Sequence, residues 1–216
     1  MNNHSDKKLN SKRFYDQTAD SYKALYGEEQ SVKYCAALSV LRRRFPQNVL
    51  DVGCGPGSFL REVVCNAKLL VGVDISARML RMAKSTTSKE FFHLICADAD
   101  HLPIREGVFD TVYAFTLLQN MPEPTATIQE MERILRSMGT MIVSVPRSAF
   151  SRQSMFQILG ESRLRCQEVE VSFELRDHLF LCQTSRLELG EMSRNDLMAG
   201  RNSITIKALG KCFGSA

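Results

Sequence analysis

The stretch Val49-Leu50-Asp51-Val52-Gly53-Cys54-Gly55-Pro56-Gly57 sets the organisation of this chain. It begins as an apolar strand and ends in a loop in which every second residue is glycine. A helix is expected directly after it, from Ser58. Glycines allow positive φ and close approach to the backbone, and the first turn of a helix offers unpaired N–H groups. The stretch therefore predicts a site where a polar ligand binds against bare backbone.

Composition and charge are those of an ordinary globular protein. The chain has 216 residues, of which 44% are hydrophobic and 24% charged, enough for one domain with a sizeable core. No apolar run is long enough to span a bilayer, and the polar N-terminus lacks a signal-peptide core. The seven cysteines form no Cys-x-x-Cys pair, so we expect reduced thiols in a cytoplasmic protein, with neither a disulfide framework nor a metal site.

Strands and helices are expected to alternate over residues 47–184. Strands are expected at 48–52, 69–73, 91–97, 109–115 and 140–145, with helices at 58–67, 76–84, 125–135 and 151–159. This alternation indicates a parallel sheet with helices on both faces. Apolar and polar side chains alternate from Cys166 onward, which predicts an antiparallel hairpin ending at Cys182.

Three further segments flank this core. Residues 1–11 are polar and are expected to be disordered. Residues 12–46 are expected to form a helical lid, and together with the core they make one domain over residues 12–184. The lid has aromatic residues in its first part and an amphipathic helix at 32–45 in its second. Residues 185–216 form a tail of uncertain structure, with a strand candidate at 204–208.

Acidic or polar residues follow four consecutive strands of the expected sheet. Asp51, Asp74 and Asp98 end the first three strands, and the segment 116–120 follows the fourth. In an open parallel sheet the ligand crevice lies outside these carboxyl ends. Asp74 follows Gly53 at the distance, about 20 residues, at which an acid that ends the second strand binds a ribose diol. Asp98 is expected to accept a hydrogen bond from the exocyclic amine of adenine.

Asp51 and Ser58 discriminate between two nucleotide cofactors. An anionic diphosphate would be repelled by the carboxylate of Asp51, whereas a cationic ligand would be attracted. The dinucleotide fingerprint Gly-x-Gly-x-x-Gly also requires glycine or alanine at the position of Ser58. Both features favour an adenosine with a positively charged amino-acid tail over NAD. S-adenosyl-L-methionine is such a molecule.

The chain resembles the class I S-adenosylmethionine-dependent methyltransferases, and among them the type 11 methyltransferase-like family. Residues 50–57, 72–76 and 97–103 are similar to the three successive motifs of that superfamily, and the similarity extends over residues 14–145. The resemblance implies an α/β, Rossmann-like doubly wound sheet of seven strands in the order 3-2-1-4-5-7-6, with strand 7 antiparallel. The hairpin at its end would supply strands 6 and 7.

The resemblance also implies which residues bind the cofactor, whose product is S-adenosyl-L-homocysteine. The glycine loop approaches the methionine part, Asp74 binds the ribose, and Asp98 with Ala99 binds the adenine. Tyr15 and Tyr22 cover the cofactor from the lid. The full expected set is Tyr15, Tyr22, Asp51, Gly53, Cys54, Gly55, Gly57, Asp74, Ile75, Asp98, Ala99, Phe115 and Thr116.

Catalytic residues are less explicit in the sequence. The segment 116–122 lacks the Asn-Pro-Pro-Tyr motif of enzymes that methylate amide or adenine nitrogens. Direct in-line displacement at the methyl group needs alignment and desolvation more than acid–base chemistry. Candidates for a base or for orienting the acceptor are Tyr15, Tyr22, His101, Gln119, Arg147 and, as a base only, His178.

Several alternatives remain open from the sequence. A Rossmann-like NAD-dependent oxidoreductase is disfavoured by Asp51 and Ser58, and a non-catalytic cofactor-binding subunit is a third hypothesis. The acceptor is either a small metabolite or a component of RNA or the translation machinery. The net charge of +4 permits either, whereas the basic pI of about 8.7 and the run Arg42-Arg43-Arg44 mildly favour the latter. Some small relatives of that kind work with a small zinc-binding activator protein.

Overall fold

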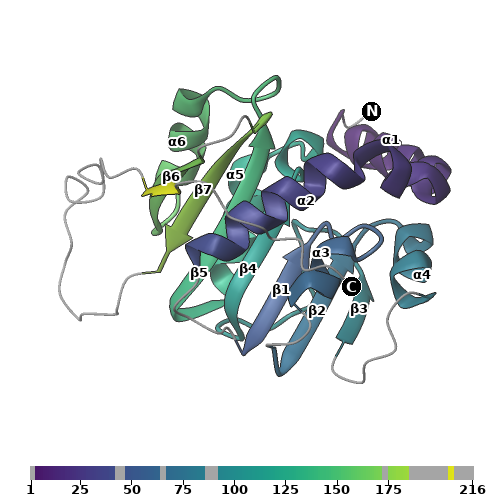
Figure 1. Ribbon diagram of the computed structural model, residues 1–216, viewed down its shortest axis with the longest axis horizontal. Helices are drawn as coiled ribbons and strands as arrows, with labels where there is room; N and C mark the ends of the chain where they lie inside the picture. Colours follow the sequence, from purple (N-terminus) through teal and green to yellow (C-terminus); the bar gives the residue numbers. More distant parts are fainter. Residues whose placement is uncertain are drawn as a thin grey trace.

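The computed structural model describes residues 3–41, 47–63, 67–85, 92–171, 175–184 and 204–206. Its strands form one twisted sheet in the order β3-β2-β1-β4-β5-β7-β6-β8 (Figure 1). The first five strands pair in parallel, β7 runs antiparallel to β5 and β6, and β8 runs parallel to β6. The predicted order 3-2-1-4-5-7-6 is confirmed, and β8 extends the sheet by one strand. The bounds are β1 Asn48–Val52, β2 Leu69–Asp74, β3 Phe92–Cys96, β4 Phe109–Phe115, β5 Leu135–Pro146, β6 Arg165–Val171, β7 Asp177–Gln183 and β8 Ile204–Ile206.

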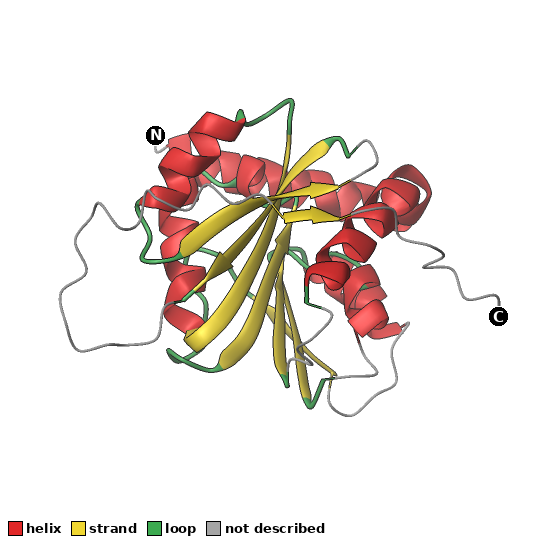
Figure 2. Ribbon diagram, turned by 60° about the vertical axis from the view of Figure 1, so that its left-hand side comes forward, coloured by secondary structure: helices red, strands yellow, loops and turns green. Residues whose placement is uncertain are grey.

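Helices cover both faces of the sheet (Figure 2). Side chains of α2, α3 and α4 pack in one core, and those of α5 and α6 pack in the other. None of the described helices is long and apolar enough to cross a membrane. The bounds are α1 Asn3–Thr18, α2 Tyr22–Val40, α3 Ser58–Val63, α4 Ala77–Ser85, α5 Pro124–Ile134 and α6 Arg152–Gly160, with 3₁₀ turns η1 Ala19–Ser21 and η2 Leu118–Asn120.

The central strand β4 shows how the sequence builds the two cores. All seven of its residues are buried. Val112 and Ala114 belong to the core under α5 and α6, whereas Tyr113 and Phe115 belong to the core under α2 and α3. Successive side chains of a strand point to opposite faces, so a strand covered on both faces is buried along its whole length and is mainly apolar. This arrangement holds the carboxyl end of β4 rigidly at the edge of the sheet.

Gly72 in β2 provides a test of how tightly this sheet is packed. A Cβ atom at this position would lie 2.7 Å from Leu60 Cδ1 and 2.8 Å from Cys54 Sγ. Both neighbours are buried, so Gly72→Ala should lower the free energy of unfolding by about 1–3 kcal/mol through overpacking. Urea unfolding followed by circular dichroism measures the change. Gly160→Ala is the control, because a Cβ there meets no atom within 4 Å. Equal stabilities of both variants and the wild type would contradict the packing argument.

The lid differs from its prediction in two respects. The expected disorder of residues 1–11 is wrong for residues 3–11, which form the first part of α1. The helix predicted at 32–45 begins earlier, at Tyr22. The residues from Tyr22 to Ser31 lack the apolar pattern of a helix packed on a sheet, so the sequence did not show this start. Residues 42–46, including the arginine run, lie outside the described residues, as do residues 185–203 and 207–216.

The expectation that all cysteines are reduced thiols is wrong for one pair. Cys166 of β6 faces Cys182 of β7 with the Cα atoms 4.0 Å apart, and the two form a disulfide. The register of the hairpin makes them partners, and the spacing along the sequence does not show that register.

Candidate cofactor site

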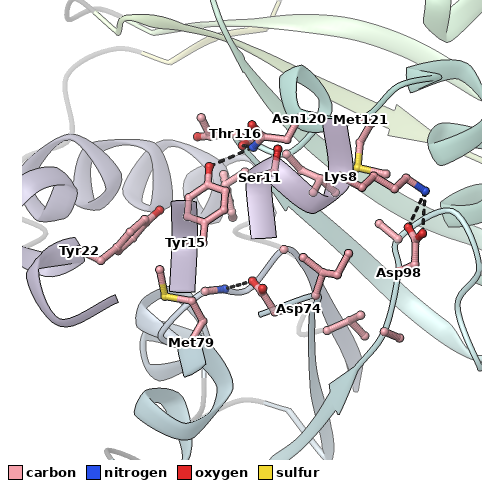
Figure 3. Close-up of a pocket in the computed structure, with 18 residues that line it drawn as sticks. Lys8, Ser11, Tyr15, Tyr22, Asp74, Met79, Asp98, Thr116, Asn120 and Met121 are labelled. Atoms are coloured by element: carbon pink, nitrogen blue, oxygen red, sulfur yellow. Dashed lines mark hydrogen bonds and ion pairs between the residues drawn. The ribbon is translucent and has the colours of Figure 1, made fainter. Parts of the chain in front are cut away.

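A cavity lies at the carboxyl edge of the sheet, beneath α1 (Figure 3). It encloses about 700 Å³ of empty space, part of which is open to solvent. Its walls come from α1, the start of α2, the glycine loop, the ends of β2, β3 and β4, and η2. Ten of the thirteen predicted cofactor residues line it: Tyr15, Tyr22, Gly53, Gly55, Asp74, Ile75, Asp98, Ala99, Phe115 and Thr116.

The glycine loop presents bare backbone to this cavity. Gly55 has φ +52°, and an added Cβ would meet no atom within 4 Å, so its open side is free for a ligand. Gly57 has φ +74°, and an added Cβ would lie 3.0 Å from Ala83 Cβ. Gly57 is therefore required for packing of the loop against α4, and it does not line the cavity. Both residues adopt the left-handed conformation that favours glycine.

Asp74 connects the end of β2 to the glycine loop. Its Oδ2 accepts a hydrogen bond from the backbone N–H of Gly55 at 2.8 Å, and its Oδ1 accepts one from the N–H of Ser76, also at 2.8 Å. Burial raises the pKa of Asp74 above its ordinary value, and these two hydrogen bonds oppose that shift. Each carboxylate oxygen keeps a second lone pair for a ligand hydroxyl.

Asp51 lies on β1 with only 3% of its surface exposed and does not line the cavity. Burial, with a smaller contribution from the charge of Asp74, raises the pKa of Asp51 to about 8. The side chain is therefore largely protonated in the free protein at neutral pH. A cation placed nearby would stabilise the ionised form and lower this pKa.

Tyr15 and Tyr22 form the wall opposite the glycine loop. Their ring centroids are 6.3 Å apart, and the hydroxyl of Tyr15 accepts a hydrogen bond from Asn120 Nδ2 at 3.0 Å. Burial raises the pKa of both phenols above the ordinary value. Both remain protonated at neutral pH, which makes them hydrogen-bonding and packing groups and poor bases.

Thr116, at the end of β4, is held in an unusual backbone conformation. Its φ is +55°, which costs a β-branched residue about 1–3 kcal/mol. Its Oγ1 accepts a hydrogen bond from Lys33 Nζ at 3.1 Å. Lys33 is fully buried in α2 and forms an ion pair with the buried Asp177 at 2.9 Å. This ion pair joins α2 and β7 behind the cavity and positions Thr116.

The other predicted catalytic residues do not line the cavity. His101 is exposed, and Arg147 is exposed with its Nε donating to the carbonyl of Leu175 at 3.1 Å. Gln119 turns back and donates to the carbonyl of Thr116 at 2.5 Å. His178 is buried against Glu168, with Nδ1 2.7 Å from Oε1. Cys54 is likewise absent from the lining, although it was expected in the cofactor set.

The most important residues that the sequence did not predict are Lys8 and Ser11 of α1. They line the cavity together with Tyr15, at successive turns of one helical face. Lys8 Nζ lies 2.8 and 2.7 Å from the two oxygens of Asp98 (Figure 3). The polar sequence of α1 carries no apolar periodicity from which this face could have been identified.

Comparison with known proteins finds one family that matches the middle part of the chain. Residues 50–143 match the family described as "Methyltransferase domain". The malonyl-[acyl-carrier protein] O-methyltransferase of Marinomonas sp. is 30% identical over 143 residues, which is 65% of this chain and 52% of that protein. The chain spans about half the length of the curated relatives it matches.

Two solved structures show the same fold. Magnesium protoporphyrin IX methyltransferase from Synechocystis, solved with bound S-adenosylmethionine, has a TM-score of 0.70 and 22% identity, and the match covers 86% of this chain and 100% of that one. A methyltransferase in complex with the Haloferax volcanii activator Trm112 has a TM-score of 0.64 and 17% identity, over 80% of this chain and 98% of that one.

Proposed function

We propose, from the premise that residues 50–143 form a class I S-adenosylmethionine-dependent methyltransferase domain, that this chain transfers a methyl group to an acceptor by direct in-line displacement. The observation that carries the proposal is the convergence in one cavity of the open Gly55 backbone, Asp74 and Asp98. These residues come from the three motifs in which the sequence resembles the superfamily.

The residues present fit S-adenosylmethionine. The unobstructed side of Gly55 leaves room for a ligand against the backbone. Asp74 has lone pairs for a ribose diol, and Asp98 has lone pairs for an exocyclic amine. Asp51, buried behind the loop, would compensate a cationic amino-acid tail. NAD gains no support from the comparisons, and its diphosphate would be repelled by these carboxylates.

The chain's own contribution to the reaction is binding, orientation and exclusion of water. When bound, S-adenosylmethionine supplies a methyl group that is already activated by a positively charged sulfur. Phe115, Leu117, Met79 and Met121 give the cavity apolar walls. Such walls exclude water, and a rigid edge of the sheet holds the acceptor in line.

The cavity favours an acceptor that arrives with a free lone pair. Among the described residues, its lining contains no histidine, and its two tyrosines remain protonated at neutral pH. We therefore propose a small acceptor whose nucleophile needs no base from the protein, such as a carboxylate. The Marinomonas relative is named malonyl-[acyl-carrier protein] O-methyltransferase. Its malonyl group offers a carboxylate nucleophile, although that acceptor is carried on a protein.

Calorimetry with S-adenosylhomocysteine and with NADH tests the cofactor assignment. We expect S-adenosylhomocysteine to bind and NADH not to bind. Incubation of the full chain with methyl-labelled S-adenosylmethionine and a cell extract, divided into ribonuclease-treated and protease-treated halves, then tests the acceptor class. Label in small molecules under both treatments supports the proposal, and label lost with either enzyme contradicts it. Absence of S-adenosylhomocysteine binding would refute the cofactor assignment.

An activator subunit of the kind named in the Haloferax structure is a separate proposal. It predicts that the isolated chain binds S-adenosylhomocysteine but labels purified acceptors only after a protein fraction is added. A purely cofactor-binding subunit would give binding without transfer in every fraction.

A further inference from the structure

Helix α1 covers the cavity without being packed into a core. None of its described side chains is fully buried, and Leu9 and Phe14 are 43% and 48% exposed. Hydrophobic burial therefore contributes little to its position, and polar contacts hold it in place. A segment with few buried apolar contacts opens at low free-energy cost.

The C-terminal end of α1 is anchored to the β2–α4 junction. Ser76 Oγ donates to Asp16 Oδ1 at 2.5 Å, and Arg78 Nη1 donates to the carbonyl of Asp16 at 2.9 Å. Arg78 also pairs with Asp20 just beyond the helix. These contacts lie on one side of the cavity and keep this end of α1 in place.

The N-terminal half of α1 is held on the opposite side by two lysines. Lys7 Nζ donates to the carbonyl of Met121 at 2.7 Å. Lys8 Nζ contacts both oxygens of Asp98 and lies 2.5 Å from Asp100 Oδ2. Burial lowers the pKa of Lys8, but the hydrogen bonds to Asp100 and Asp98 raise it to a net value above the ordinary one, so the ammonium is charged. Lys8 therefore ties α1 across the cavity.

This contact occupies the carboxylate that the cofactor needs. Under the proposed function, Asp98 accepts a hydrogen bond from the exocyclic amine of adenine. In the structure Asp98 Oδ1 accepts from Lys8 Nζ and from the backbone N–H of Asp100 at 3.0 Å, and Oδ2 accepts from Lys8 Nζ. Lys8 itself lines the cavity, so its ammonium takes the place that the amine would occupy. An ammonium and an adenine amine compete for the same acceptor, so the closed position of α1 and entry of the adenine oppose each other.

We propose that Lys8 is an electrostatic latch that closes α1 over the adenine end of the cavity and must release Asp98 before the nucleotide enters. This inference rests on the proposed function. Asp100, only 12% exposed, keeps a carboxylate within reach of the displaced ammonium, so α1 closes again over the bound ligand. The latch thus sets the rate of cofactor entry.

Stopped-flow mixing with S-adenosylhomocysteine tests the latch. The chain has no tryptophan and five tyrosines, of which Tyr15 and Tyr22 line the cavity, so tyrosine emission reports binding. Lys8→Gln should raise the association rate about five-fold at low salt. Raising salt from about 50 mM to about 500 mM screens the ion pair between Lys8 and Asp98. It should therefore raise the association rate for the wild type and leave the association rate for Lys8→Gln unchanged. S-adenosylhomocysteine carries no net charge, so long-range steering does not produce this salt effect.

Two control variants and one ligand-free measurement complete the test. Lys8→Arg keeps the charge and should keep the salt effect, and Lys84→Gln removes a charge from the exposed end of α4 and should behave as wild type. Hydrogen exchange of the α1 amides in the free protein should be faster in Lys8→Gln. If hydrogen exchange in Lys8→Gln is unchanged, or if salt speeds association to Lys8→Gln as much as association to the wild type, the latch alone is overturned. Failure of S-adenosylhomocysteine to bind the wild type would overturn the proposed function and the latch with it.

Discussion

Asp74→Asn should weaken binding of S-adenosylhomocysteine by about 100-fold or more. The carboxylate accepts hydrogen bonds from the N–H groups of Gly55 and Ser76 and keeps its remaining lone pairs for the ribose. An asparagine amide would point its NH₂ group at one of these N–H donors, which leaves that donor unpaired and shifts the glycine loop. The loss of two charge-assisted hydrogen bonds costs about 3 kcal/mol, which corresponds to roughly 100-fold in affinity.

Calorimetric titration of wild type and variant with S-adenosylhomocysteine measures this effect. Asp6→Asn is the matched control, because it makes the same chemical change at an exposed position of α1. Circular dichroism melts of both variants establish that they are folded. A dissociation constant for Asp74→Asn within two-fold of the wild-type value would show that the carboxylate has no part in the site.

Asp51→Asn should stabilise the free protein by an amount that grows with pH. The pKa of Asp51 is raised by burial from 3.8 to about 8 in the folded chain. Between these values the folded chain holds a proton that the unfolded chain has released, so the wild-type free energy of unfolding falls as pH rises. Asparagine does not ionise. The difference between variant and wild type should therefore increase by about 1 kcal/mol per pH unit and level off above pH 8.

The same substitution should weaken cofactor binding and remove its pH dependence. An ionised Asp51 attracts the cationic tail of the ligand, so binding should release a proton below pH 8 and the wild-type affinity should rise with pH. We expect Asp51→Asn to bind S-adenosylhomocysteine about 30-fold more weakly, with affinity independent of pH between about 6 and 8, since the loss of a buried charge pair costs about 2 kcal/mol or more.

Two measurements check both parts of this prediction. Urea unfolding at about pH 5, 7 and 9 gives the stability difference, and calorimetry in buffers of different ionisation enthalpy gives the number of protons released on binding. A constant stability difference across this range, or proton release equal in wild type and variant, would show that Asp51 does not titrate as described.

The core of the fold and most of the site were predictable from local patterns. The strands β1 and β4 have the predicted bounds, because each is a mainly apolar run that ends at glycine or a polar residue, as expected of a strand buried on both faces. The positions of Gly55, Asp74 and Asp98 follow from the same patterns, since right-handed crossovers bring the carboxyl ends of parallel strands to one edge. Tyr15 and Tyr22 were expected there only from the resemblance to the methyltransferases.

Residues whose role depends on distant partners were not predictable in this way. Lys8 lies in a polar segment, and its carboxylate partners are 90 residues or more away along the chain. In the sequence, nothing distinguishes Lys33 from other helix residues or Asp177 from other turn residues. The fold buries the two side chains together as an ion pair behind Thr116. His101 and Arg147 have suitable chemistry, but the fold exposes both side chains to solvent.

The sequence by itself determined the sheet, the glycine loop and the carboxylates that follow its strands, because hydrophobic periodicity and glycine placement act over a few residues. Only the tertiary structure decided that Gly55 faces an open cavity while Gly57 packs against Ala83, and that Asp51 is buried enough to hold a proton near neutral pH. It also decided that Lys8 of α1 pairs with Asp98 across the cavity. Burial, pKa and ion pairing depend on segments far apart in the chain, and their proximity exists only in the folded protein.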